Sequence, residues 1–300
     1  MRLINSTWLE IEDYLTKSDG IIVPTGSIEQ HGPMGLIGTD TICVDEIALS
    51  VGKRITCLVT PAMWFTPAEF NMGFPGTLSV SEALFQSLCT EVFNSLERHG
   101  FRHIYVLNGH GANLEPLKKA ASYVELADIR VKSWWDFRSV NKLREKYFGD
   151  WEGMHATPSE IAITQVNNRV IKSSLVEKPP EKISPDFIKA HAGDQHGSAS
   201  EHRHAFPDGR VGSHSALADR DKGIELLRSA SHSVEKDYLD LNDTDYILTE
   251  GKKFGLAPKI HVNQFNSFGG VALGVKHQAL SVDHLEELKP EDISALKESN

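Results

Sequence analysis

Short β-branched runs, each followed by a glycine-containing polar loop, most strongly constrain how this chain can fold. Gly20–Pro24, Phe101–Leu107 and Ile129–Trp135 have the length and composition of buried strands. The clearest helix is Ser81–Arg98, which Gly100 ends and in which apolar residues recur at helical spacing: Leu84, Leu88, Val92 and Leu96. Strands that alternate with helices predict an α/β fold, a three-layer α/β/α arrangement with a mostly parallel central sheet.

The loop after Gly20–Pro24 gathers residues that bind metals. Within a short stretch it contains Glu29, His31 and Asp40. Carboxylate oxygens and an imidazole nitrogen suit Zn²⁺, Mn²⁺ or Fe²⁺ better than Ca²⁺ or Mg²⁺. In open α/β sheets, ligands bind at the carboxyl ends of the strands. Taken alone, this stretch fits a polar surface loop equally well.

A second loop of the same kind follows Phe101–Leu107. Here His110 lies between Gly109 and Gly111, which allow a sharp turn and a close approach to a ligand. A helix is expected from Leu114 to Leu126. Two strand-end loops that both carry ligand-type residues favour a common site over ordinary polar loops.

A third cluster surrounds a predicted helix start. Thr157 followed by Pro158 is typical of a helix entry, and Glu160 then lies in the first turn, where the helix dipole keeps it ionised. The local sequence alone favours a simpler interpretation, a capping box between Thr157 and Glu160.

These clusters together resemble the creatininase (creatinine amidohydrolase) family of metal-dependent amidohydrolases. The matching runs are Gly26–Pro33 with Thr39 and Asp40, Phe74–Thr77, Asn108–Asn113, His155 and Ala156 with Glu160, and a closing segment within 209–223. The resemblance covers residues 1–240. It implies a creatininase-like fold, two divalent metal ions, with zinc expected and manganese or iron as alternatives, and hydrolysis of a small molecule. The bond would be an amide or related C–N bond, of cyclic amide or formamide type, cleaved through a metal-activated water.

The resemblance also assigns roles to individual residues. Asp40 would bridge the two ions within a ligand set that comprises Glu29, His31, Asp40, His110 and Glu160. Glu160 is also expected to take part in catalysis. His155 lies on the loop before the Glu160 helix, and a histidine there can protonate a departing nitrogen near neutral pH. A buried structural histidine is the alternative for His155.

Departures from the family pattern bear on the substrate. Met34 replaces a usual histidine, Thr157 replaces a usual glycine, and Ala112 stands where creatininase has a glutamate. The last change argues against creatinine as the substrate. The intact ligand set favours catalysis over the alternative function, a non-catalytic metal-binding or regulatory and assembly module that retains the fold.

The composition argues against nucleic-acid and membrane partners, and the family resemblance implies a small-molecule substrate. The formal net charge of −10 argues against nucleic acid. No apolar run reaches membrane-spanning length, and no secretory signal pattern begins the chain. The three cysteines are scattered, which favours a reducing cytoplasm. The family resemblance implies a closed homo-oligomer.

A histidine-rich segment follows the third cluster. His191, His196, His202 and His204 crowd the stretch 178–210. Their spacing matches no compact metal-ligand pattern, so a lid or an intersubunit loop is the more economical hypothesis than a third metal site.

The last sixty residues have a different character. Asp240–Asp245 is acidic and turn-rich, which predicts a boundary between a domain of residues 1–240 and an extension of residues 241–300. Lys259–Asn263 has the composition of a strand, and Asn266–Val275 that of a glycine turn leading into another, so a β-hairpin is predicted. The second run faintly resembles the end of β-ketoacyl synthases. The extension is expected to serve assembly or to contact a partner enzyme, without catalytic residues.

Overall fold

The chain was analysed as a computed structural model, which describes residues 1–193, 197–253, 256–257, 259–261, 270–283, 288 and 290–299. It divides into two compact units, Met1–Lys236 and Asp237–Asn300. The division falls within helix α9, Arg220–Lys253. The prediction of a turn-rich segment at Asp240–Asp245 was therefore wrong. Neither glycine nor proline occurs between Gly223 and Gly251, so no helix-breaking residue interrupts this stretch.

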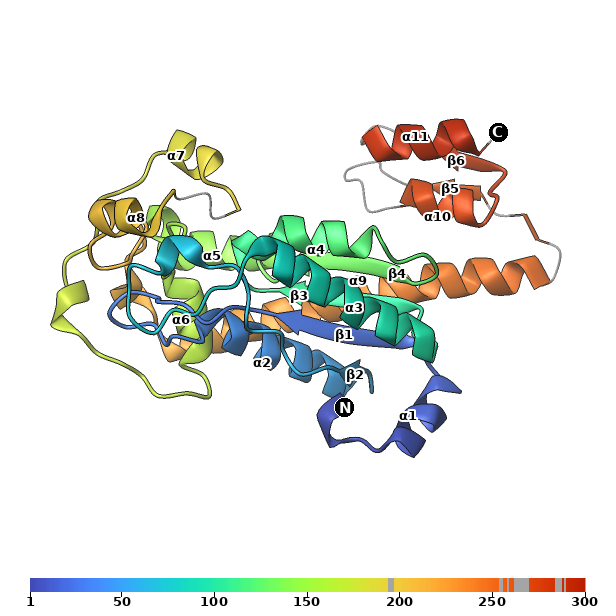
Figure 1. Cartoon of the computed structure of the whole chain (residues 1–300), viewed down its shortest axis with the longest axis horizontal. Coiled ribbons are helices and arrows are strands. Elements are labelled where there is room, and N and C mark those ends of the chain that lie inside the picture. Colours follow the sequence, from blue (N-terminus) through green and yellow to red (C-terminus); the bar gives the residue numbers. More distant parts are fainter. Residues whose placement is uncertain are drawn as a thin grey trace. The chain divides into compact units, whose positions relative to one another are not determined.

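A parallel four-stranded sheet forms the centre of the first unit (Figure 1). Its strand order is β2-β1-β3-β4, with β1 at Gly20–Thr25, β2 at Leu58–Val59, β3 at His103–Asn108 and β4 at Asp128–Ser133. In this register Thr25, Asn108 and Ser133 are neighbours, so β1, β3 and β4 end at the same edge. The loops that follow these strands therefore start side by side.

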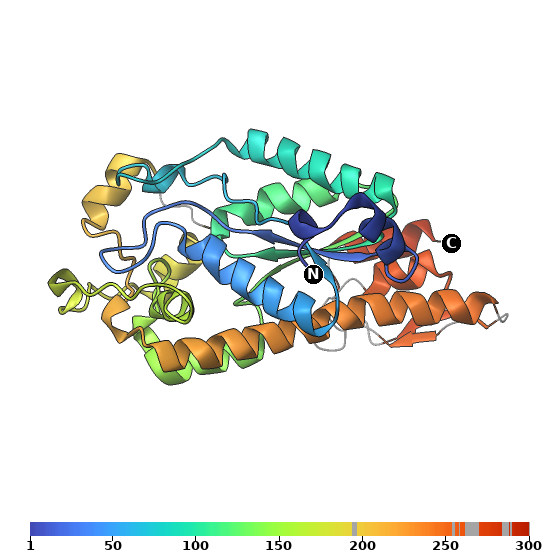
Figure 2. The same ribbon diagram turned by 90° about the horizontal axis from the view of Figure 1, so that it is seen from below.

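Helices cover both faces of this sheet, which confirms the predicted three-layer α/β/α architecture. Figure 2 shows α3 (Glu82–His99) and α4 (Leu114–Ala121) on one face and α2 (Thr39–Arg54) on the other. Helix α9 runs beside α2, where Arg54 and Glu235 form an ion pair. Helix α4 is shorter than predicted, because the residues after Ala121 continue as turns toward β4.

The packing of α3 differs from the expected one. Leu84 and Leu88 of the predicted apolar stripe are 58% and 45% exposed. Leu96 of that stripe is buried, together with Phe85, Cys89 and Phe93 of the adjacent stripe, and these residues pack against alternate residues of the sheet: Ile21, Val23, Ile104 and Val106. Two apolar stripes run along this helix, and the one with the larger aromatic side chains fills the core.

The remaining helices of the first unit surround the carboxyl edge of the sheet or precede β1. They are α1 at Trp8–Leu15, α5 at Arg138–Phe148, α6 at Pro158–Thr164, α7 at Pro185–Ala190 and α8 at Ala199–Ala205. Short 3-10 turns lie at Leu3–Asn5, Glu69–Asn71, Gly111–Asn113, Gly149–Trp151, Ser174–Val176 and Ser215–Leu217. Of the helices in the described ranges, none combines the length and apolarity that a bilayer crossing requires.

The second unit contains a strand–helix–strand arrangement. β5 (Lys259–His261) and β6 (Ser281–Asp283) are parallel, with α10 (Gly270–Lys276) between them, and α11 (Pro290–Glu298) follows. The predicted β-hairpin was therefore wrong, because parallel strands need a crossover connection. Within and just after α10, buried residues recur every third position: Val271, Gly274 and His277. The part of the β-ketoacyl synthase resemblance carried by residues 266–269 lies outside the described residues.

Candidate metal centre

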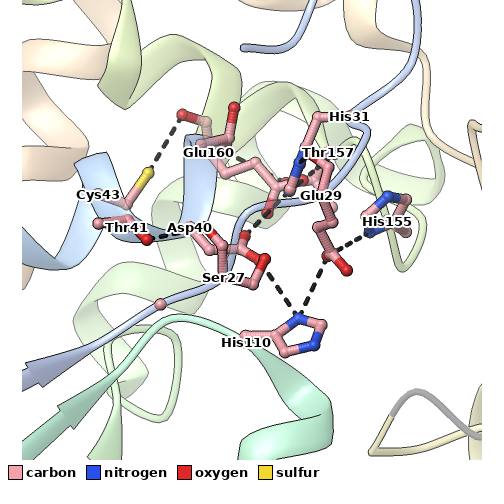
Figure 3. A network of polar contacts seen from close by, with 12 residues as sticks. Ser27, Glu29, His31, Asp40, Thr41, Cys43, His110, His155, Thr157 and Glu160 are labelled. Carbon is pink, nitrogen blue, oxygen red and sulfur yellow. Dashed lines mark hydrogen bonds and ion pairs between the residues drawn. The ribbon is translucent and has the colours of Figure 1, made fainter. Parts of the chain in front are cut away.

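The structure brings all six predicted site residues together at the carboxyl edge of the sheet (Figure 3). The loop after β1 carries Glu29 and His31, the loop after β3 carries His110, and the α6 region supplies His155 and Glu160. All of these side chains are buried, and Glu29 is completely so.

Asp40 lies in the first turn of α2, whereas the sequence placed it on a loop. Ser27 Oγ donates a hydrogen bond to Asp40 Oδ2 (2.8 Å), and Thr41 Oγ1 donates one to the backbone oxygen of Ser27 (2.8 Å). These two bonds tie the loop after β1 to the start of α2. The helix therefore fixes the position of the carboxylate.

Each of the three histidines places one ring nitrogen against a backbone carbonyl. His31 Nδ1 lies 3.1 Å from the Glu29 oxygen, His110 Nε2 lies 2.7 Å from the Pro67 oxygen, and His155 Nε2 lies 2.7 Å from the Gln30 oxygen. In a neutral ring that nitrogen donates its hydrogen, so the other nitrogen keeps its lone pair. Histidines that ligate metals have this arrangement.

The second nitrogens of His31 and His110 face the two oxygens of Asp40. His31 Nε2 is 3.0 Å from Asp40 Oδ1 and 3.8 Å from Glu160 Oε1. His110 Nδ1 is 3.2 Å from both Asp40 Oδ2 and Glu29 Oε1. Two groups that could each hold a metal ion therefore share Asp40: Glu29 with His110, and His31 with Glu160. A third group joins Glu29, His31 and His155.

The donor atoms fit a divalent cation. Glu29 Oε1 is buried and has no hydrogen-bond partner in the described part of the chain. It faces His110 Nδ1, the ring nitrogen that keeps its lone pair when Nε2 donates its hydrogen to the Pro67 oxygen. Two acceptors in contact, both shielded from water, require a cation or a proton between them. Mixed carboxylate and imidazole donors of this kind suit zinc or manganese.

Burial and mutual charge shift the pKa values of these groups. Burial raises the pKa of Glu29, and it raises the pKa of Glu160 to about 8. Burial also raises the pKa of Asp40, but the imidazoles of His31 and His110 outweigh it and hold that pKa well below its usual range. Burial lowers the pKa of His31, but the carboxylates, Asp40 foremost, raise it to about 10. Without a metal, these shifts favour a protonated His31 beside an ionised Asp40.

Glu160 fulfils both of the interpretations that the sequence left open. The Thr157 hydroxyl accepts a hydrogen bond from the Glu160 amide (3.3 Å), and the Thr157 amide donates to Glu160 Oε1 (2.5 Å), which together make a capping box. The same Oε1 atom lies 3.8 Å from His31 Nε2. One carboxylate thus caps α6 and faces the centre.

Two residues of the site carry no signal in the sequence. Asn71 Nδ2 donates a hydrogen bond to Glu29 Oε2 (3.0 Å), and Asn71 Oδ1 accepts one from Gln30 Nε2 (2.7 Å). The Phe70 ring lies nearly parallel to His110, with centroids 6.2 Å apart. Both residues come just before the Phe74–Thr77 motif, and nothing else distinguishes them from an ordinary loop.

A pocket of about 300 Å³ opens onto the centre. Its far wall includes Trp134, Trp135 and Arg144, and the 178–210 segment contributes Ile188, Ala192 and Gly193. His202 is buried against Phe70, with ring centroids 5.1 Å apart. The candidate metal groups of the described residues do not include His191, His202 or His204, and His196 lies outside those residues.

The fold and the centre together define an α/β enzyme with a buried set of candidate metal ligands at the carboxyl edge of its sheet. The chain belongs to the creatininase family. The model of this family, which is described as creatinine amidohydrolase, matches residues 5–237. This membership confirms the predicted resemblance and identifies the chain as an enzyme of a hydrolase family.

Individual relatives agree with this membership. A 3-dehydro-scyllo-inosose hydrolase of Thermotoga maritima is 30% identical over 256 residues, which cover 78% of this chain and 82% of that protein. Solved creatininases, one a Zn-Zn type and one a Mn form, match with TM-scores of 0.62 and 0.61 at 20% identity. Each match covers 80% of this chain and 97% of the creatininase, and it shows the common fold.

A different group of relatives matches a limited part of this chain. An imidazolonepropionase of Flavobacterium johnsoniae is 43% identical over 129 residues, which make up 43% of this chain. The chain covers 30% of that relative's own length.

Proposed function

We propose that this chain is a metal-dependent hydrolase that cleaves an amide or related C–N bond, of cyclic amide or formamide type, in a small molecule. The observation that carries the proposal is the pair of candidate metal groups that share Asp40 and open into the pocket. No observation favours the alternative of a non-catalytic module.

The proposed cofactor is a pair of divalent ions, zinc or manganese. Asp40 would bridge them, with Glu29 and His110 on one ion and His31 and Glu160 on the other, as the two groups are arranged. Ions held in this way act as Lewis acids on a scissile carbonyl and lower the pKa of a bound water.

The protein's own groups would position the reaction and move its proton. Asn71 holds Glu29 Oε2, which leaves Oε1 directed at the centre. His155 donates Nε2–H to the Gln30 oxygen, so its Nδ1, 3.6 Å from Glu29 Oε1, is the atom that could pass a proton to the departing nitrogen. Phe70 and Trp134 help to keep bulk water from these groups.

The setting of the enzyme forms part of the proposal. A cytoplasmic location, a homo-oligomer, and a role of residues 241–300 in assembly or in contact with a partner enzyme are consistent with the composition and with the separate compact unit at the end of the chain.

The direct test combines metal analysis with a substrate panel. Purified protein loaded with zinc or manganese is expected to bind two ions per chain and to hydrolyse at least one compound among formamides, cyclic amides and lactams. Asp40→Asn is expected to lose both ions and all turnover, because both groups depend on this carboxylate. Plasma emission spectrometry and a chromatographic product assay give the two measurements.

Asp45→Asn is the matched control. It removes a carboxylate from the same helix, but Asp45 pairs with Arg2 at the surface rather than with the centre. Full metal content in Asp40→Asn would refute the bridging arrangement. A protein that holds two ions and hydrolyses nothing in the panel would refute the proposed substrate class.

A further inference from the structure

The far wall of the pocket carries a single basic side chain. Among the described residues that line the pocket, Arg144 of α5 is the one lysine or arginine, and the acidic lining residues are Glu29, Asp40 and Glu160. The pocket therefore combines the carboxylates of the candidate metal centre with one localised positive charge, that of Arg144.

Neighbouring residues fix the orientation of this guanidinium. Arg144 Nε donates a hydrogen bond to Glu152 Oε1 (2.9 Å), and Nη1 donates one to Asn141 Oδ1 (2.7 Å). The guanidinium carbon lies 5.7 Å from the centre of the Trp134 ring. In the described part of the chain, Nη2 has no hydrogen-bond acceptor. A guanidinium held at two positions keeps donors for a planar ligand and loses little freedom when it binds one.

Glu152 connects this wall to the candidate centre. It is buried, and its Oε1 also accepts a hydrogen bond from the Ser159 hydroxyl, next to Glu160 on α6. Hydrogen bonds through Glu152 therefore link Arg144 to Ser159, the chain neighbour of Glu160. A molecule that reached both Arg144 and the centre would be held at two ends.

The charge balance favours a single carboxylate over a more highly charged group. Glu152 already neutralises much of the Arg144 charge. One arginine paired in this way can offset a single negative charge but leaves the second charge of a dianion such as a phosphate uncompensated. A carboxylate also matches the planar geometry of the guanidinium edge.

We propose that Arg144 binds a carboxylate of the substrate. The substrate class is then an amide or related C–N compound that carries one carboxylate away from the scissile bond. This inference rests on the proposed function, and it names the substrate class of the same site.

Matched pairs of compounds test it: N-formyl-β-alanine and N-formyl-γ-aminobutyrate, each with its carboxamide. In each pair the size is nearly constant and the negative charge is removed. The zinc-loaded enzyme is expected to prefer the carboxylate by about 10- to 100-fold in kcat/KM, the usual range for a charge-assisted hydrogen bond. Arg144→Met is expected to abolish the preference, because it raises KM more for the carboxylate than for the carboxamide.

Arg138→Met, an exposed arginine of the same helix, is the matched control and is expected to keep the preference. Arg144→Lys keeps the charge and loses the planar guanidinium, so it is expected to retain part of the preference for the carboxylate. This variant replaces Arg144→Met in the test if Arg144→Met does not fold. Added methylguanidinium is expected to restore carboxylate turnover in Arg144→Ala. If Arg144→Met lowered kcat/KM equally for both members of a pair, the role of Arg144 would be structural and the proposal would be overturned.

Calorimetric binding of the same pairs separates this inference from the proposed function. Tighter binding of the carboxylate, lost in Arg144→Met, would support the role of Arg144 even if no compound were hydrolysed. Hydrolysis without any preference for the carboxylate would overturn the role of Arg144 and leave the proposed function intact. Tighter binding of a phosphonate analogue than of the carboxylate would also overturn it.

Discussion

His155 is the residue whose two possible roles differ most clearly. Its Nδ1 lies 3.6 Å from Glu29 Oε1. At this distance His155 can act either as a metal ligand in the third candidate group or as a proton donor. His155→Asn is expected to keep two ions per chain and to reduce turnover by about 10²–10⁴-fold, the usual loss for a general acid or base. Metal content and kcat, measured on one preparation, check both statements.

The same variant also tests the alternatives. Loss of one ion in His155→Asn would identify His155 as a ligand. Near-normal turnover with both ions bound would assign the proton transfer to another residue. Gln165→Leu, a buried polar residue of the cap of α6, controls for general damage to this region.

Single residues differ in how well the sequence reveals them. Glu29, His31 and His110 could be found because each follows a strand and belongs to a side-chain type that binds metals. Asn71 could not, because its role depends on two hydrogen bonds to Glu29 and Gln30, which lie 42 and 41 positions away along the chain. Arg144 likewise gains its position from the way α5 packs on the pocket.

Among the elements, the loop after β3 and the first turn of α2 are in close contact at Gly109. A Cβ atom on Gly109 would lie 2.7 Å from the backbone oxygen of Asp40 and from Val44 Cγ1. The sequence predicted that the glycines beside His110 permit a close approach to a ligand. For Gly109 the close neighbour is the backbone of another helix.

Gly109→Ala is therefore expected to separate these two elements. The overpacking should lower the free energy of unfolding by about 1–3 kcal/mol and weaken metal binding, because His110 and Asp40 would move apart. Denaturant titration and metal calorimetry measure the two effects. Gly38→Ala is the control, since its Cβ would meet nothing nearer than Ile28 Cδ1 at 3.8 Å. Unchanged metal affinity in Gly109→Ala would contradict the expectation.

In the first unit, whether a segment forms a strand or a helix was more predictable from the sequence than which elements it packs against. The strands β1, β3 and β4 follow directly from β-branched composition, and Gly100 ends α3 with a φ of 104°, as expected of a left-handed helix cap. The second unit was misread because the glycines near residue 270 suggested a turn. Gly270 instead begins α10, a helix that crosses over between the two parallel strands.

At the scale of the whole molecule, metal binding is coupled to the protons of the centre. In the metal-free protein the pKa of His31 is raised to about 10 and that of Glu160 to about 8, so both hold protons at neutral pH. A metal must displace them, and its apparent affinity should therefore rise with pH and fall as acid is added. Between pH 6 and 8 we expect a rise of about tenfold per pH unit for each displaced proton.

Calorimetry with Mn²⁺ in two buffers of different ionisation enthalpy measures this proton release directly. The Asp45→Asn variant, whose substituted group lies outside the centre, should show the same slope as the wild type. A metal affinity that stays constant from pH 6 to 8 would mean that the metal does not displace protons from His31 and Glu160.

The second unit offers a further test at this scale. A chain that ends at residue 240 keeps the buried face of α9, which consists of Leu226, Ala230, Val234 and Tyr238. It is expected to bind two ions per chain and to keep its turnover, while its oligomeric state or its capture of a partner changes. Light scattering after size-exclusion chromatography, with metal analysis, measures both. Normal assembly combined with lost turnover would instead place the tail at the active site.

The pocket is encoded by two separate sets of chain segments. Its floor comes from residues 26–40, 108–113 and 155–160, whereas its far wall comes from residues 134–144 and 185–193. The second set contains no candidate ligand, although Arg144 is linked through Glu152 to Ser159, next to Glu160. A mutant library confined to 134–143 and 185–193 would therefore sample new selectivities on an unchanged reaction, which makes this chain a suitable starting point for directed evolution.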